Sequence, residues 1–176
     1  ARGDTQDQVR FVDDLFNGLK DYGFIVLKDH TVDQSKVDEA YEMANQFFSL
    51  SDEVKRQYKH NQGGGQRGYT PFKTEHAKDQ TTPDLKEFWH VGRELSEDSR
   101  YKGIYPENIW PEEIPRFREH MMNLYNSMDA TSVLLLEAIG KGLDLPRNFL
   151  KEMVHDGNSI LRVIHYPPTE GEDTKN

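Results

Sequence analysis

Residues 160–168 of the chain read Ile-Leu-Arg-Val-Ile-His-Tyr-Pro-Pro, and a short polar tail follows them to Asn176. The apolar and β-branched residues predict a strand, and the two prolines predict its end. The residues after it supply no further strand with which it could pair. We therefore expect the first strand of a larger β-structure, whose remaining strands lie outside these 176 residues.

The composition indicates one folded domain and argues against several classes of protein. A chain of 176 residues can bury one core, and 11% aromatic residues argue against disorder. The net charge of -9 argues against nucleic-acid binding, because phosphate contacts need clustered lysines and arginines. The chain has no cysteine, which excludes disulfides and cysteine-bound zinc and is compatible with a cytoplasmic location. No apolar run approaches the roughly 20 residues of a membrane span, so we expect no membrane partner.

Apolar residues recur at helical spacing in several segments, so we predict five helices. With their caps, these helices are predicted over residues 4–23, 33–48, 51–58, 111–142 and 146–153. Ser51 is expected to cap the third helix, because its hydroxyl can accept from a free backbone N–H. Pro111 is expected to open the longest helix, because proline is well suited to a first helical turn.

Three segments are predicted to be strands, namely residues 24–27, 87–92 and 159–165. In the middle segment, strand alternation places Phe88 and His90 on one face. Trp89 and Val91 then share the opposite face. Residues 59–86 are polar and glycine-bearing, and we predict a flexible loop there. A phosphate-binding loop, a lid over a substrate and a plain connector all remain open for this segment.

Five short motifs follow one another along the chain. They are Tyr22-Gly23-Phe24 before a predicted strand, Arg67-Gly68-Tyr69, Lys86-Glu87-Phe88 leading to Val91-Gly92, Asn108-Ile109-Trp110-Pro111, and Leu161-Arg162 leading to Tyr166-Pro167-Pro168. In this order they resemble the N-terminal half of the isopenicillin N synthase-like family of iron(II)-dependent oxygenases, most of which use 2-oxoglutarate. The resemblance covers nearly the whole chain.

The resemblance implies an α+β fold in which helices pack on one side of a double-stranded β-helix, or jelly roll. The chain would contain the helical N-terminal layer and the first strands of an incomplete jelly roll. Two regions are expected: an N-terminal dioxygenase region over residues 1–158, with residues 59–86 as its substrate loop, and the first strand of the catalytic core over residues 159–176.

The resemblance also implies an iron site built from a His-x-Asp pair and a distant histidine. None of the seven histidines is followed two residues later by Asp or Glu. We therefore expect no metal ligand and no catalytic residue in this chain, and no activity from the fragment alone. The full-length protein would use Fe(II), 2-oxoglutarate and O2 to oxidise a small molecule, most often by hydroxylation.

Five residues are candidate binding residues through the resemblance. Tyr166 matches the tyrosine of the family's Asn-x-Tyr, which helps to hold 2-oxoglutarate. Arg67 and Tyr69 would lie near the mouth of the active site, and Phe88 and His90 would face the substrate. The alternative for each is structural: strand-end packing for Tyr166, loop chemistry for Arg67 and Tyr69, and a core or rim position for His90.

Two further residues lie on the same face of the closing strand as Tyr166. Ile164 occupies the position of the family's asparagine, and an isoleucine cannot hydrogen-bond to a carboxylate. Arg162 either pairs with an acidic group of the helical layer, which we favour, or faces the barrel interior. Because of Ile164, two other functions stay open: an oxidase of the same fold that does not use 2-oxoglutarate, and a non-catalytic binding module that has lost the iron site.

Overall fold

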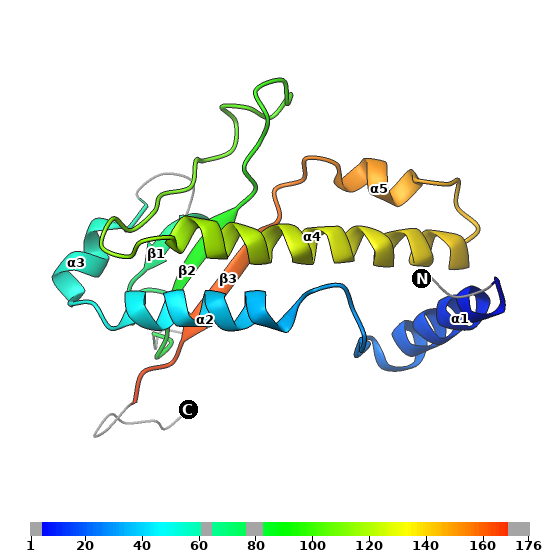
Figure 1. Cartoon of the computed structure of the whole chain (residues 1–176), viewed down its shortest axis with the longest axis horizontal. Helices are drawn as coiled ribbons and strands as arrows, with labels where there is room; N and C mark the ends of the chain where they lie inside the picture. Colours follow the sequence, from blue (N-terminus) through cyan, green and yellow to red (C-terminus); the bar gives the residue numbers. More distant parts are fainter. Residues whose placement is uncertain (1–4, 61–64, 77–82, 169–176) are drawn as a thin grey trace. The chain divides into compact units, whose positions relative to one another are not determined.

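A computed structural model describes residues 5–60, 65–76 and 83–168. The elements in these segments follow the order α1, α2, α3, β1, β2, α4, α5 and β3 (Figure 1). The helices span Thr5–Tyr22 (α1), Gln34–Phe48 (α2), Asp52–Gln57 (α3), Phe117–Gly142 (α4) and Phe149–Val154 (α5), and the strands span Gly68–Thr70 (β1), Glu87–Gly92 (β2) and Ile160–His165 (β3). None of these helices has the length and apolarity needed to cross a membrane.

The chain divides into two compact units, and α4 contributes to both. One unit comprises residues 1–34 and 126–157, and the other comprises residues 35–125 and 158–176. Strand β3 therefore belongs to the same unit as β1 and β2. The division into functional regions at residue 158 stays a prediction from the family resemblance.

The second unit is built on an antiparallel sheet with the strand order β1-β2-β3. Strand β2 lies in the middle, and its register with β3 places Phe88 opposite Ile164 and His90 opposite Arg162. The expectation that the closing strand has no partner in this chain is therefore wrong. Strand β1 was missed within the predicted loop, because three residues are too short to show alternation.

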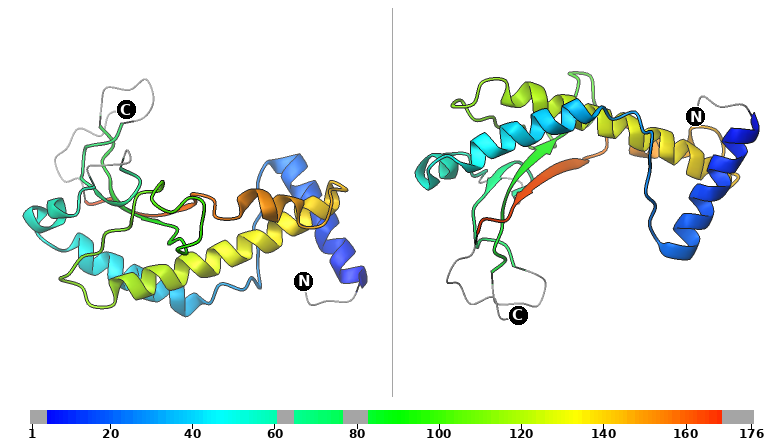
Figure 2. Two further views of the ribbon diagram at one scale, coloured as in Figure 1. Left: turned by 90° about the horizontal axis from the view of Figure 1, so that it is seen from above. Right: turned by 60° about the horizontal axis from the view of Figure 1, so that its bottom comes forward.

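Helix α2 and the first turns of α4 cover one face of this sheet (Figures 1 and 2). The core lies between these layers, where the Phe47 ring meets Trp89 edge-on with 4.6 Å between centroids. Phe117, the first residue of α4, lies 5.1 Å from the same indole. All three side chains are buried, and truncating such an aromatic residue to alanine typically costs about 3–5 kcal/mol. A helical layer on a partial sheet confirms the predicted α+β class.

The loop before α4 is attached to the end of β2 by one asparagine. The side-chain amide of Asn108 donates to the carbonyl of Gly92, and its oxygen accepts from the N–H of Gly92, each at 2.8 Å. The side chain thus satisfies both backbone groups of Gly92, as a neighbouring strand would. This contact accounts for the asparagine in the Asn-Ile-Trp-Pro motif.

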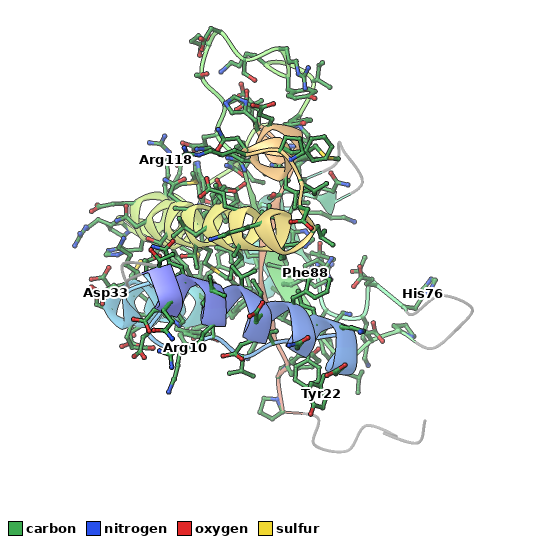
Figure 3. All side chains as sticks on the ribbon, turned by 90° about the vertical axis from the view of Figure 1, so that its right-hand side faces the viewer. Arg10, Tyr22, Asp33, His76, Phe88 and Arg118 are labelled. Carbon is green, nitrogen blue, oxygen red and sulfur yellow. The ribbon has the colours of Figure 1, made fainter. Side chains whose placement is uncertain are left out.

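The first unit is built from α1, α5 and the later turns of α4. Helix α1 ends as predicted at Gly23, which has a φ of 76° and donates its N–H to the carbonyl of Leu19 at 3.0 Å. Thr31 and Thr131 share a hydrogen bond of 2.8 Å between their hydroxyls, which ties the segment after α1 to α4. Tyr22, at the end of α1, is 75% exposed (Figure 3).

The predicted strand over residues 24–27 is wrong. This segment is neither helix nor strand, and the side chains of Phe24 and Val26 are 66% and 88% exposed. Apolar and β-branched residues favour an extended backbone, but a strand also needs a partner. No strand of the described segments pairs with this one.

Two predicted helix starts differ in their outcome. Ser51 caps α3 as expected, because its Oγ accepts from the N–H of Val54 at 3.4 Å. The longest helix, however, begins at Phe117 and not at Pro111. Pro115 disfavours a helical backbone at the residue before it, and Arg116 has a φ of 67°, outside the helical region.

Candidate functional site

A cavity of about 690 Å³ lies on the face of the sheet that carries Phe88 and His90. Strand β3 contributes Ile160 and Arg162 to its wall, and the segment after β1 contributes Glu75. The alternation predicted for residues 87–92 is confirmed, because Trp89 packs against the helices on the opposite face. Phe88, labelled in Figure 3, is only 2% exposed.

His90 connects three parts of this cavity. Its Nδ1 lies 2.7 Å from the carbonyl oxygen of Gly65, and its Nε2 accepts a hydrogen bond of 2.6 Å from Nε of Arg162. A guanidinium can only donate, so the imidazole proton is on Nδ1, which donates to Gly65. Burial lowers the pKa of His90, and the charge of Arg162 lowers it further, against the hydrogen bond to Gly65. The imidazole is therefore a neutral acceptor for Arg162.

Arg162 faces this cavity and not the helical layer. Its Cζ lies 4.3 Å from the ring centroid of Phe88, so the guanidinium stacks over that ring. Its carboxylate neighbour is Glu75, with 3.6 Å between Nη1 and Oε2. Glu75 belongs to the segment after β1, so the favoured prediction of a partner in the helical layer is wrong. The same carboxylate is bound more closely by Lys86, at 3.1 Å.

The other candidate residues from the sequence occupy different surroundings. Tyr69 lines part of the cavity, and its hydroxyl donates to Glu87. Burial and then this hydrogen bond raise the pKa of Tyr69. Tyr166 follows β3 and is 67% exposed, and its role towards 2-oxoglutarate stays a prediction.

Arg67 is fully buried beside Gly92 and does not line the cavity. Its Nη2 donates to the side-chain oxygen of Asn158, and its Nη1 donates to the carbonyl of Gln66, each at 2.8 Å. Burial lowers the pKa of its guanidinium. The structure thus places Phe88 and His90 side by side in the cavity wall, turns the ring of Tyr69 towards the helical layer and leaves Arg67 outside the cavity. The binding roles of these residues stay predictions.

A buried carboxylate on the opposite face of the sheet was not predicted. Glu87 accepts from Nζ of Lys55 at 2.9 Å and from Tyr69, and lies 2.8 Å from Nδ1 of His165. Burial alone would raise the pKa of Glu87, but the hydrogen bonds from Tyr69, His165 and Lys55 outweigh it and hold the pKa below its usual value. Glu87 is 32 positions from Lys55 and 78 positions from His165, so no sequence spacing signals the cluster.

A smaller cavity of about 300 Å³ lies in the same unit between the loop after β2 and Arg118. Arg118 forms a bidentate pair with Glu94, at 3.0 and 2.7 Å. Lys102, which also lines it, pairs with Glu97 at 2.9 Å. We take the larger cavity as the candidate site, because it contains Phe88 and His90, two of the residues predicted to bind the substrate.

Within the residues that the structure describes, the side chains do not fit an iron site of the family type. The described segments contain no group of three or more His, Asp or Glu side chains that could hold a metal ion. His90, which lines the cavity, and His165 on β3 are engaged by Arg162 and Glu87. The described side chains of the cavity can therefore bind and orient a ligand, but they do not form a metal centre.

Comparison with known families agrees with this architecture. The family model described as "non-haem dioxygenase in morphine synthesis N-terminal" matches residues 1–113. The chain therefore belongs to this family of non-haem dioxygenase N-terminal regions, and the predicted resemblance is confirmed.

Relatives and solved structures extend the match beyond residue 113. The 2-oxoglutarate-dependent dioxygenase frbA of Dothideomycetidae sp. (strain 11243) is 28% identical over 96% of this chain and 52% of its own length. The proline hydroxylase buaE of Petromyces alliaceus is 30% identical over 94% of this chain and 52% of its own. The chain thus spans about half the length of these curated relatives.

Two solved structures share the fold. A protein from Caulobacter crescentus assigned to the 2OG-Fe(II) oxygenases is 45% identical, with a TM-score of 0.86 over 97% of this chain and 55% of its own. A full-length protein from Neurospora crassa, solved in complex with alpha-KG and thymine, is 26% identical, with a TM-score of 0.78 over 94% of this chain and 52% of its own. Both confirm the fold, and this chain covers about half of each structure.

Proposed function

We propose that this chain is the N-terminal half of an iron(II)- and 2-oxoglutarate-dependent oxygenase, and that the cavity on the sheet binds its organic substrate. Membership of the dioxygenase N-terminal family is the observation that carries the proposal. The names of the relatives support Fe(II) and 2-oxoglutarate as the cofactor and co-substrate of the complete protein. Its O2 and small-molecule partners, its cytoplasmic location and the lack of a nucleic-acid partner remain predictions.

The cavity suits an organic substrate in size and in chemistry. A volume of about 690 Å³ lies within the usual range for small-molecule sites. Phe88 supplies an apolar wall, while Arg162 and His90 supply polar groups held in a defined orientation. These residues would bind and orient the substrate, whereas the family's oxidative chemistry comes from its metal.

An oxidase that does not use 2-oxoglutarate is the second candidate. Ile164 favours it, because this residue lies where the family's asparagine would help to hold the co-substrate. Ile164 pairs with Phe88 across the sheet and is 42% exposed. Because its side chain is apolar, it supplies no polar group at that point of β3. Succinate formation separates the two candidates.

The test uses the protein expressed from its complete coding sequence and loaded with Fe(II). Succinate is measured with 2-oxoglutarate and O2, first alone and then with a panel of small organic compounds. We expect slow succinate formation alone and faster formation with a substrate. Substrate oxidation without succinate would indicate the second candidate, and no turnover at all would contradict both.

A matched pair of variants tests the role of the cavity. Ile160→Trp fills the cavity from its wall, and we expect at least about a tenfold loss of substrate-dependent succinate formation. Ile104→Trp introduces the same bulk at a residue that is 69% exposed outside this cavity. Equal effects of the two variants would place the substrate elsewhere.

A further inference from the structure

We propose that Arg162, oriented by His90, is an anchor for a carboxylate group, so that the ligand of the cavity is an organic acid. The inference rests on the proposed function and narrows the substrate class. It assigns the charged contact to Arg162 on β3 and not to Arg67, the arginine that the family resemblance places near the mouth of the active site.

The orientation of the guanidinium is set on two sides. His90 accepts from Nε at 2.6 Å, and the ring of Phe88 lies under Cζ at 4.3 Å. Both contacts use the inner part of the group and leave its outer nitrogens, Nη1 and Nη2, towards the cavity that Arg162 lines. A planar fork of donors matches a planar group with two acceptor oxygens.

His90 orients Arg162 without supplying a negative charge. A carboxylate in its place would neutralise Arg162 and weaken its attraction for an anion. A neutral imidazole accepts from Nε and leaves the positive charge intact. The bond from Nδ1 to the carbonyl of Gly65 fixes the tautomer, so His90 is a positioning residue for Arg162.

Glu75 shows that a carboxylate can approach this arginine. Its Oε2 lies 3.6 Å from Nη1, which is an ion pair but too long for a hydrogen bond. The same oxygen is 3.1 Å from Lys86, which also binds Asp84 at 2.9 Å. Lys86 thus holds the Glu75 carboxylate near Arg162, although Glu75 and Arg162 do not form a hydrogen bond with each other. A ligand carboxylate would compete with Glu75 for the outer nitrogens.

A carboxylate could belong to the substrate or to 2-oxoglutarate, and the experiment separates these sources. The complete protein is studied without metal, so that binding is read independently of turnover. Phenylacetate, phenylacetamide and 2-oxoglutarate are titrated in turn, with binding followed by NMR. We expect phenylacetate to bind more tightly than its uncharged amide.

Arg162→Gln is expected to weaken binding of the acid about tenfold or more and to leave the amide unchanged. Arg118→Gln is the matched control, because that arginine is paired with Glu94 outside the cavity. Loss of phenylacetate binding assigns the anchor to the substrate, and loss confined to 2-oxoglutarate assigns it to the co-substrate. The proposal is overturned if neither acid depends on Arg162.

Two further variants separate anchoring from general stability. Glu75→Gln removes the competing carboxylate, so acid binding should tighten by about two- to fivefold. A merely structural role for Arg162 would predict no such gain. His90→Leu should weaken acid binding, and His90→Gln should restore it, because a glutamine can accept from Nε and donate to Gly65. If the complete protein forms succinate and this does not depend on Arg162, the proposed oxygenase function stands and the carboxylate anchor at Arg162 is rejected.

Discussion

Arg67, in the segment before β1, and Gly92, at the end of β2, compete for the same small space. A Cβ on Gly92 would lie 1.8 Å from Cζ of Arg67. The guanidinium cannot easily move away, because it is fully buried and hydrogen-bonded to Asn158 and Gln66. The position therefore requires glycine for space, and the buried arginine ties the segment before β1 to the start of β3.

Gly92→Ala should destabilise the protein by about 1–3 kcal/mol, because the methyl group overpacks this contact. The measurement is the free energy of unfolding in urea. Gly140→Ala is the control, since its Cβ would meet Leu150 at an ordinary 3.7 Å within a helix. A Gly92→Ala protein as stable as the wild type would show that Arg67 has another position available.

Glu87→Gln should cost about 3–5 kcal/mol at pH 7, because it leaves the buried charge of Lys55 with only the exposed carboxylate of Asp52, at 3.1 Å, as an ion-pair partner. The Lys55 and Glu87 side chains are only 7% and 4% exposed, so water cannot replace the lost partner. Urea unfolding measures the loss. Glu119→Gln, which breaks an exposed pair with Arg116, should change stability by less than about 1 kcal/mol.

At the scale of elements, the presence of a pairing partner decided where a strand formed, and residue composition did not. Residues 24–27 have the composition of a strand and remain unpaired, whereas β1 has three residues, one of them a glycine, and pairs with β2. Gly68 suits this strand because its φ is 68°, and a Cβ there would lie 2.6 Å from the carbonyl of Tyr58. Strand β1 thus depends on its pairing with β2 and on the close approach of the Tyr58 backbone to Gly68.

The same substitution at two valines tests this difference. Val26→Thr should change the free energy of unfolding by less than about 0.5 kcal/mol, because this valine is 88% exposed. Val91→Thr should cost about 1–3 kcal/mol, because it buries a hydroxyl in the core beneath the helices. A large effect at Val26 would mean that the segment is covered by some other part of the protein.

At the scale of the whole molecule, two buried groups make stability depend on pH. The pKa of Glu87 is below its usual 4.5, so its contribution is present above that value and is lost as the pH falls through the lowered pKa. The pKa of His90 is below its usual 6.5, because burial and the charges of Arg162 and Arg67 lower it more than the charge of Glu75 raises it. The folded state then binds fewer protons than the unfolded state, so stability also falls as the pH drops below 6.5.

Urea unfolding followed from pH 8 down to about pH 3 should therefore show two losses of stability on acidification. His90→Gln should remove the component that begins below pH 6.5. Glu87→Gln should remove the one that begins below pH 4.5. A His90→Gln protein with an unchanged pH profile would show that this imidazole does not titrate differently in the two states.

Sequence alone determined the presence of the five helices and the alternation of β2, although not the start of α4, because these depend on near neighbours. The apolar spacing of α1 and α2, the cap at Ser51 and the end at Gly23 act within one or two turns. The order of five motifs along the chain was enough for the family. The period of a strand predicted that Phe88 and His90 share one face, and both line the cavity.

Only the tertiary structure decided which side chains meet. Arg162 and His90 are 72 residues apart, and Lys55 and Glu87 are 32 apart, so neither contact leaves a pattern in the sequence. The same holds for β1, which forms because β2 lies beside it, and for residues 24–27, which lack such a neighbour in the described chain. Long-range hydrogen bonds and burial decide these points, and local propensity carries no information about them.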